Sequence, residues 1–232
     1  MHEIGFDIIG ELHINPNDSF NWENKASSLY CIVTGNVSSD LRVVVQVLAH
    51  LAKYYQGVFY VPGMLEYETS ENVHDRANEI AQICSRIPNV ILLHQSVIVI
   101  DGVGVMGING WSEAGSLATV PDMVKTAARY EDTKYLNATL EKLQRHLDVK
   151  KIILVSNAVP KEELYFGEEP PVVYDQIPLT SALYVDTEKK VKHWVFGTYT
   201  KNVDTVIDDI QYLNNPYLGK KPYWPKRLTV SV

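Results

Sequence analysis

Apolar residues in the first third of the chain form short continuous runs, separated by longer segments of helical periodicity. The short runs have the length and the β-branched content of buried strands, and they occupy residues 6–12, 28–35 and 57–63. Two longer segments repeat apolar residues at helical spacing and predict helices at residues 40–55 and 70–87. Asp40 is a suitable N-cap for the first helix, and Pro88 follows the end of the second. This alternation of strand and helix predicts an α/β domain.

The rest of the chain predicts more strands, one long polar helix and a hairpin. We expect these elements at residues 89–108 (strands with turns at 94–95 and 101–102), 121–147 (helix), 150–160 (strand) and 182–199 (a hairpin turning at the charged residues 188–190). The strands therefore fall into at least two groups within one α/β domain.

Three glycines in the predicted hairpin region match a well-known ligand-binding spacing. Gly102, Gly104 and Gly107 fit the G-x-G-x-x-G pattern of dinucleotide-binding turns. That motif requires a strand before it and a helix after it, whereas strands are predicted on both sides here. We interpret these glycines as part of a closely packed hairpin, not a dinucleotide site.

Length, charge and cysteine content limit the class of protein. A chain of 232 residues with 46% hydrophobic residues is sufficient for one sizeable core, so we expect a single domain over residues 1–232. The formal net charge of −7 argues against general nucleic-acid binding, which relies on excess Lys and Arg. Cys31 and Cys84 indicate buried thiols of a reducing compartment, not a disulfide framework. No basic leader and no membrane-length apolar run occurs, so we expect a cytoplasmic protein with no membrane partner.

Five loops at predicted strand ends resemble, in order and spacing, the motifs of one known family. In chain order they are "GELH" (10–13), "TGNV" (34–37), "VPGMLEYE" (61–68), "VSNAVP" (155–160) and "FGTYTKNVD" (196–204). They are similar to the D-x-H, G-D, G-N-H-E/D, H and G-H-x-H motifs of the calcineurin-like metallophosphoesterases. Segments 99–112 and 214–225 resemble that family's hairpin and its closing Asn-Pro-x-Gly segment. The resemblance covers almost the whole chain and implies an α/β fold, a two-sheet αββα sandwich with residues 216–232 as a closing tail.

The resemblance also implies where catalytic groups should lie, and most of them are replaced. In that family, two divalent cations share a bridging Asp and activate a water that attacks a phosphate ester, while a His assists the leaving group. The first motif retains His13 and has Glu11 for Asp, and the bridging Asp of the second motif is Asn36. The other ligand or catalytic positions carry residues that hard cations do not prefer, and these are Met64, Leu65, Asn157, Thr198 and Thr200.

Two functions remain open for such a chain. We favour a pseudoenzyme with no intact catalytic residue, no metal and a binding, assembly or structural role. Burying a carboxylate without a compensating ion costs several kcal/mol, on the order of the effective burial penalty of an ion. In a chain that no longer binds metal, we therefore expect the ligands of the site to be replaced together. The alternative is a metal-dependent phosphoesterase, a hydrolase that holds one Mn²⁺ or Zn²⁺ at Glu11, His13 and Asn36.

The replaced catalytic loop carries apolar residues that suit contacts with protein. Met64 and Leu65 would place apolar surface in the former cleft, and contiguous exposed apolar patches usually mark interaction sites. We expect this face to be covered by the chain's own tail, through Tyr223 and Trp224, by a protein partner, or by a second copy in a homo-oligomer. The basic residues of segment 220–227 could instead hold phosphate or an acidic partner, or simply cover the edge of the fold.

Overall fold

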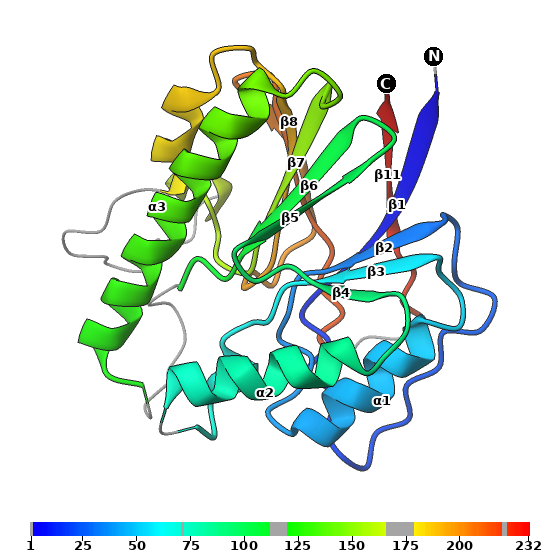
Figure 1. Cartoon of the computed structure of the whole chain (residues 1–232). Coiled ribbons are helices and arrows are strands. Elements are labelled where there is room, and N and C mark those ends of the chain that lie inside the picture. The colour runs from blue at the N-terminus through cyan, green and yellow to red at the C-terminus, as the bar shows by residue number, and fades with distance from the viewer. Residues whose placement is uncertain (1, 71, 112–119, 166–178, 220–221) are drawn as a thin grey trace.

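Two β-sheets packed face to face form the centre of the molecule, and helices cover their outer faces (Figure 1). The computed structural model describes residues 2–70, 72–111, 120–165, 179–219 and 222–232. The first sheet has the order β11-β1-β2-β3-β4, with strands at Lys226–Ser231, Glu3–Ile9, Tyr30–Val33, Gly57–Tyr60 and Val90–Leu92. The second has the order β5-β6-β7-β8-β10-β9, with strands at Ser96–Ile100, Val103–Ile108, Lys151–Ser156, Val191–Phe196, Ile210–Asn214 and Val203–Ile207. This arrangement confirms the expected two-sheet αββα sandwich.

Each sheet is covered by helices on the face that points away from the other sheet (Figure 1). Helices α1 (Leu41–Leu51) and α2 (Val73–Ser85) lie on the first sheet, and the long helix α3 (Asp122–Arg145) lies on the second. The Asp40 side chain accepts a hydrogen bond from the Arg42 amide at 2.9 Å, which confirms its role as N-cap of α1. Asn72 caps α2 in the same way. Within the described segments, no helix is both long and apolar enough to cross a membrane.

The space between the sheets is filled by an apolar core. It includes fully buried residues from both sheets, among them Phe6, Phe59, Ile153 and Val195. Such burial excludes water from between the sheets and gives the sandwich its main stabilisation. Cys31 and Cys84 are both free and buried, as expected.

The hairpin expected at 182–199 is wrong in its first half. Residues Leu179–Val185 form the 3₁₀ helix η3, and only Val191–Phe196 forms a strand. Because β8 pairs in parallel with β7, the segment before it must cross over the sheet instead of pairing with β8. The charged residues 188–190 belong to that crossover, where the Lys190 ammonium caps α3 by donating to the Leu143 and Gln144 carbonyls at 3.1 and 2.8 Å.

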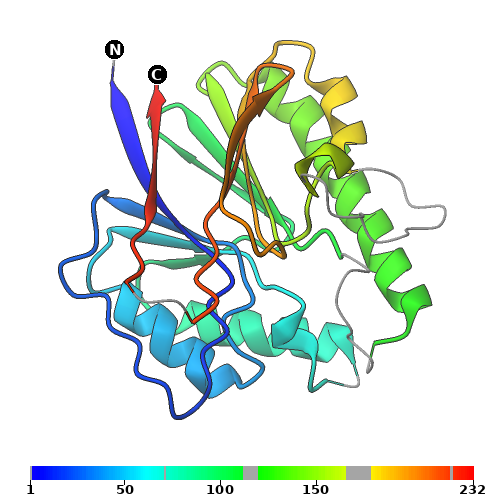
Figure 2. The ribbon, with the colours of Figure 1, turned by 180° about the vertical axis from the view of Figure 1, so that it is seen from behind.

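The β5–β6 hairpin was predicted from the sequence, whereas two other features of the sheets were not. The Asp101–Gly102 turn joins β5 and β6 with φ angles of 45° and 89°, so the G-x-G-x-x-G spacing lies in a hairpin as predicted. The β9–β10 hairpin and β11 were not predicted. Strand β11 returns to pair antiparallel with β1, and the two chain ends lie side by side in Figure 2.

Candidate functional site

The five predicted loops meet at one end of the sandwich, although they are far apart in the sequence. Strands β1, β2 and β3 are parallel neighbours in the first sheet, and β7 and β8 are parallel neighbours in the second. Each loop follows the carboxyl end of its strand, where open α/β sheets place their ligands. The structure thus brings together the predicted residues Glu11, Asn36, Met64, Asn157 and Thr198, as the contacts below show.

Glu11 is the central group of this site, and both of its carboxylate oxygens are engaged. It is 4% exposed. The Asn36 amide donates to Oε1 and Oε2 at 2.9 and 3.0 Å, and the Thr198 backbone N–H donates to Oε1 at 2.7 Å. His13 Nε2 lies 3.1 Å from Oε2. These donors compensate the charge of a nearly buried carboxylate without an ion.

The Asn36 side chain is satisfied at both ends. Its Oδ1 accepts a hydrogen bond from the Leu65 backbone N–H at 2.9 Å, which fixes the orientation of the amide. The Nδ2 group must therefore face Glu11, as observed. A donor stands where the resemblance would place a metal-bridging carboxylate.

Asn157 and Thr198 close the second half of the site. The Thr198 hydroxyl and the Met64 backbone N–H donate to Asn157 Oδ1 at 2.7 and 3.3 Å. Asn157 Nδ2 donates to the Thr34 carbonyl at 2.7 Å, which ties the β7 loop to the β2 loop. A Cβ at Gly63 would lie 2.3 Å from Asn36 Oδ1 and 2.8 Å from Asn157 Nδ2, so the loops pack here as closely as a glycine allows.

Glu66 is a second buried carboxylate at this end of the sandwich, and its contacts are structural. It is fully buried and accepts hydrogen bonds from the backbone N–H groups of Asn36, Val37 and Gly63 at 3.1, 2.7 and 2.8 Å. The Tyr60 hydroxyl donates to it at 3.0 Å. Burial raises the pKa of Glu66, while these donors act in the opposite direction. Glu66 therefore holds the β2 and β3 loops in their relative positions.

Four residues of the site have a left-handed backbone. Glu11, His13, Asn36 and Thr198 have φ angles of 51°, 47°, 53° and 51°. Such conformations are uncommon outside glycine and cost about 1–3 kcal/mol each, and they are most unfavourable for a β-branched residue such as threonine. The hydrogen bonds of the Glu11 and Asn36 side chains help to hold the loops in this conformation.

The remaining predicted residues lie at the rim of the site or away from it. The His13 side chain is 43% exposed, and its hydrogen bond to Glu11 raises the pKa of the imidazole. Thr200 is exposed. Tyr223 is buried and its hydroxyl donates to the Asn215 carbonyl at 2.6 Å, whereas Trp224 is 59% exposed. Lys220 and Lys221 of the predicted basic tail lie outside the described residues, as does Ser112 of the segment 99–112.

The residues present do not fit the pair of divalent cations that the fold family implies. A hard cation requires free oxygen lone pairs, and here the Glu11, Asn36 and Asn157 oxygens accept hydrogen bonds from protein donors. Within the part of the chain that the structure describes, no group of three or more His, Cys, Asp or Glu side chains is arranged to hold a metal ion. No catalytic step through a metal follows from this donor set.

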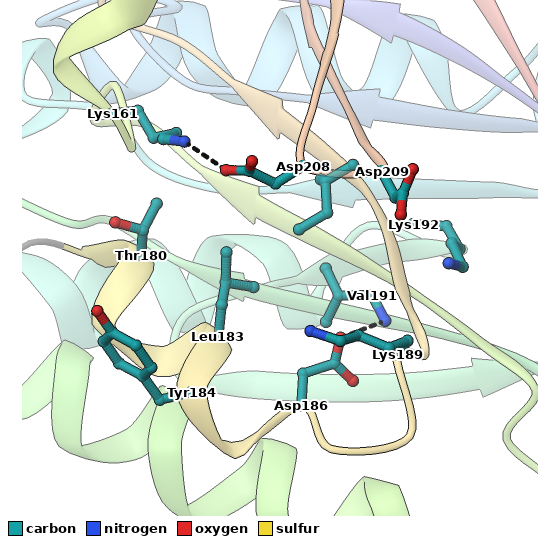
Figure 3. Close-up of a pocket in the computed structure, with 11 residues that line it drawn as sticks. Lys161, Thr180, Leu183, Tyr184, Asp186, Lys189, Val191, Lys192, Asp208 and Asp209 are labelled. Carbon is teal, nitrogen blue, oxygen red and sulfur yellow. Dashed lines mark hydrogen bonds and ion pairs between the residues drawn. The ribbon is translucent and has the colours of Figure 1, made fainter.

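A separate hollow of about 440 Å³ lies at the other end of β8 (Figure 3). Its lining includes Tyr184 from η3, Val191 at the start of β8 and Asp208 in the β9–β10 turn. Lys161 Nζ lies 3.0 Å from Asp208, and Asp186 accepts the Val191 backbone N–H at 3.1 Å, so two of its carboxylates are already engaged. None of the predicted site residues lines this hollow.

Comparison of the sequence with known proteins gives a distant viral relative. No protein-family model matches the chain. Uncharacterized protein L509 of Acanthamoeba polyphaga mimivirus is 21% identical over 120 residues, which cover 45% of this chain and 43% of the viral protein. The match therefore spans less than half the length of that relative.

Solved structures match over nearly the whole chain. Phosphopantetheinyl hydrolase (PptH) from Mycobacterium tuberculosis aligns with a TM-score of 0.63 and 16% identity over 97% of this chain and 96% of its own. A Staphylococcus aureus protein described as a 5′-nucleotidase aligns with a TM-score of 0.59 and 12% identity over 100% of this chain and 51% of its own. GAP50, the anchor in the inner membrane complex of Plasmodium, aligns with a TM-score of 0.50 and 9% identity over 91% of this chain and 71% of its own. The chain therefore has a two-sheet α/β fold of the metallophosphoesterase type.

Proposed function

We propose that this protein is a catalytically inactive member of the metallophosphoesterase-type fold that serves in binding, assembly or structure. The observation that carries the proposal is the closed hydrogen-bond network around Glu11. The Asn36 amide and the Thr198 N–H occupy the carboxylate oxygens that a cation would need. A carboxylate satisfied by protein donors gains little from an ion, because binding the ion would first break those hydrogen bonds.

The residues at the former catalytic loop support a packing role. Met64 is 6% exposed and belongs to the apolar core of the first sheet, and Leu65 is half-buried. Neither side chain can donate or accept a proton as a general acid or base does. The neighbouring Tyr67 ring packs against Trp111 with 4.9 Å between ring centroids, which extends the apolar contacts of this loop. GAP50, whose structure is similar, is described as an anchor in the inner membrane complex of Plasmodium, which supports an assembly role.

The alternative function is a metal-dependent phosphoesterase with a residual site at Glu11, His13 and Asn36. The half-exposed imidazole of His13 beside Glu11 favours it, and the neighbour PptH is described as a hydrolase. For Asn36 to offer an oxygen to the same ion, its amide would have to rotate. That rotation would bring Nδ2 against the Leu65 N–H and break the bond at 2.9 Å. We therefore propose the inactive protein over the hydrolase.

Metal content and thermal stability test the proposal directly. We expect the purified protein to contain no stoichiometric metal, and its melting temperature to be unchanged by EDTA or by Mn²⁺ or Zn²⁺. A bound ion at a hundredfold excess over its dissociation constant would raise stability by about 2.7 kcal/mol, or roughly 5–11 °C for a chain of this length. Hydrolysis of aryl phosphate monoesters and diesters should stay at background with each metal.

Matched variants identify the source of any metal effect. His13→Ala removes the imidazole at the site, and His74→Ala removes an exposed imidazole on α2 as the control. A metal-dependent rise in melting temperature, or a turnover, that is lost in His13→Ala and kept in His74→Ala would overturn the proposal and establish the hydrolase.

A further inference from the structure

Strand β5 forms one edge of the second sheet, and its solvent-facing side chains are apolar. Val97 and Val99 are 36% and 42% exposed and lie on the same face of the strand, since alternate residues of a strand share a face. Ile98 and Ile100, on the opposite face, pack against the core between the sheets. The strand thus packs against the core on one face and leaves its two valines partly exposed to solvent on the other.

Among the described strands, β5 has a neighbour on one side only, and its outward-facing backbone groups belong to the same two residues. The two-residue Asp101–Gly102 turn makes Ile100 and Val103 a hydrogen-bonded pair of the β5–β6 ladder. Hydrogen-bonded and non-hydrogen-bonded pairs alternate along an antiparallel ladder, so Ile98 faces β6 with its N–H and C=O. The N–H and C=O of Val97 and Val99 therefore point away from the sheet and are open to another strand.

The other edge strands of the two sheets carry features that discourage pairing. Strand β4 has only three residues, β11 carries Lys226 and Arg227, and β9 carries Asp204. Short edge strands and charged side chains are the usual protection against edge-to-edge association. The sequence of β5, SVIVI, has neither a charge nor a proline.

We infer that two copies of this chain associate through antiparallel pairing of their β5 strands, about a two-fold axis at Ile98. Val97 would then face the partner's Val99, with both N–H and C=O groups exchanged at each such pair. The paired residues of β5, from Ser96 to Ile100, carry no charge, so no two like charges oppose each other along the strand. A second copy is the fitting occupant because the exposed strand is complementary to itself in side chains, charge and hydrogen bonding.

This inference deepens the assembly role in the proposed function but does not depend on the loss of catalysis. The metal experiment tests the site at the strand ends, and the experiment below tests β5 alone. Either result can fail without the other.

Solution mass across a concentration series tests the dimer. We expect sedimentation or light scattering to give twice the 26.2 kDa mass of the chain. In the Val97→Lys/Val99→Lys double variant, lysines would face lysines across the axis, and the dimer dissociation constant should rise at least about tenfold. Val206→Lys, at a 66% exposed valine on the edge strand β9, is the matched control and should remain dimeric. A monomeric wild type at roughly 500 µM, or a dimer that ignores the double variant, overturns the inference.

A cysteine placed on the proposed axis tests the register. The cysteine of Ile98→Cys would face the same cysteine of the partner copy across the axis and should form a disulfide-linked dimer on mild oxidation. The native Cys31 and Cys84 are buried and should not interfere. Ile100→Cys lies on the same face of β5 but would face the partner's Ser96, so it should remain unlinked. Equal cross-linking of both variants would contradict the proposed pairing, even if the protein is a dimer.

Discussion

Asn36→Asp is the most direct perturbation of the candidate site, because it restores the residue type that the resemblance places there. In the protein as it stands, the Asn36 amide donates to both Glu11 oxygens at 2.9 and 3.0 Å. The substitution replaces this donor with a second carboxylate at the same distance. In the absence of metal we expect it to destabilise the fold.

The size of the effect follows from the distance and the burial. Two unit charges about 3 Å apart repel by roughly 5.5 kcal/mol at an effective dielectric constant of 20. The pair can avoid this by sharing a proton, but raising a carboxyl pKa from about 4 to above 7 itself costs about 4 kcal/mol at pH 7. We expect a loss of about 3–5 kcal/mol at pH 7, equivalent to roughly 6–20 °C in melting temperature. In the folded variant the pKa of the carboxyl pair is raised, so the destabilisation arises only when both carboxyl groups would ionise in the unfolded chain. The loss of stability should therefore diminish as the pH falls toward about 4.

Thermal and urea unfolding in EDTA at pH 5 and pH 7 measure this loss. The Asn36→Asp/Glu11→Gln double variant is the control, because it exchanges the acid and the amide and leaves one charge between them. It should recover at least half of the stability lost in the single variant. If Asn36→Asp is as stable as the wild type at pH 7, or if the double variant recovers nothing, then the amide does not compensate the Glu11 charge and the reasoning is refuted.

Four further predictions concern the same loops. Glu11→Gln should lower the pKa of His13, because the hydrogen bond to Glu11 is the largest cause of its raised value; an NMR titration of the imidazole measures the shift, and an unchanged pKa would contradict the contact. Because the pKa of His13 is raised in the folded state, its contribution to the free energy of unfolding is complete below pH 6.5 and is lost as the pH rises through the folded-state pKa. The difference in unfolding free energy between the wild type and His13→Ala should therefore shrink over that pH range. Glu66→Ala should lower the free energy of unfolding by at least about 3–5 kcal/mol, because it leaves three backbone N–H donors and the Tyr60 hydroxyl without their buried acceptor. Urea unfolding measures the loss, and a loss below about 1 kcal/mol would show that the loops hold their positions without Glu66. Met64→Asn with Leu65→His should give no phosphoesterase activity with Mn²⁺ or Zn²⁺ and should lower the melting temperature, because it puts polar groups where a methionine is 6% exposed; a gain of turnover would contradict the inactive assignment.

Much of the architecture could be predicted from local patterns in the sequence. Strand β6 and helix α3 extend over residues whose periodicity alone indicates their type. The Asp101–Gly102 turn and the Asp40 cap depend on neighbouring backbone groups, so short-range chemistry sufficed to place them. The two-sheet fold was predicted from the order of the five loops along the chain. No single loop would have been enough for that prediction.

The elements that were missed depend on partners far away in the chain. Residues Leu179–Val185 have the apolar content of a strand, but the sheet offers them no edge, because β8 already lies between β7 and β10. They pack as a 3₁₀ helix beside α3 instead. Strand β11 forms only because β1 accepts it as an antiparallel neighbour more than two hundred residues away.

The sequence by itself determined which residue types stand at the five loops, and through the resemblance it predicts that most ligands of a two-metal site are replaced. Only the tertiary structure decided what the replacements do. The donor that completes the Glu11 network is the Thr198 backbone N–H, which every residue except proline carries and which no sequence pattern could therefore reveal. It reaches Glu11 because the β1 and β8 loops, 187 positions apart, meet at the junction of the two sheets. The sequence fixes the chemical groups, whereas the packing of the sheets fixes the distances at which those groups interact.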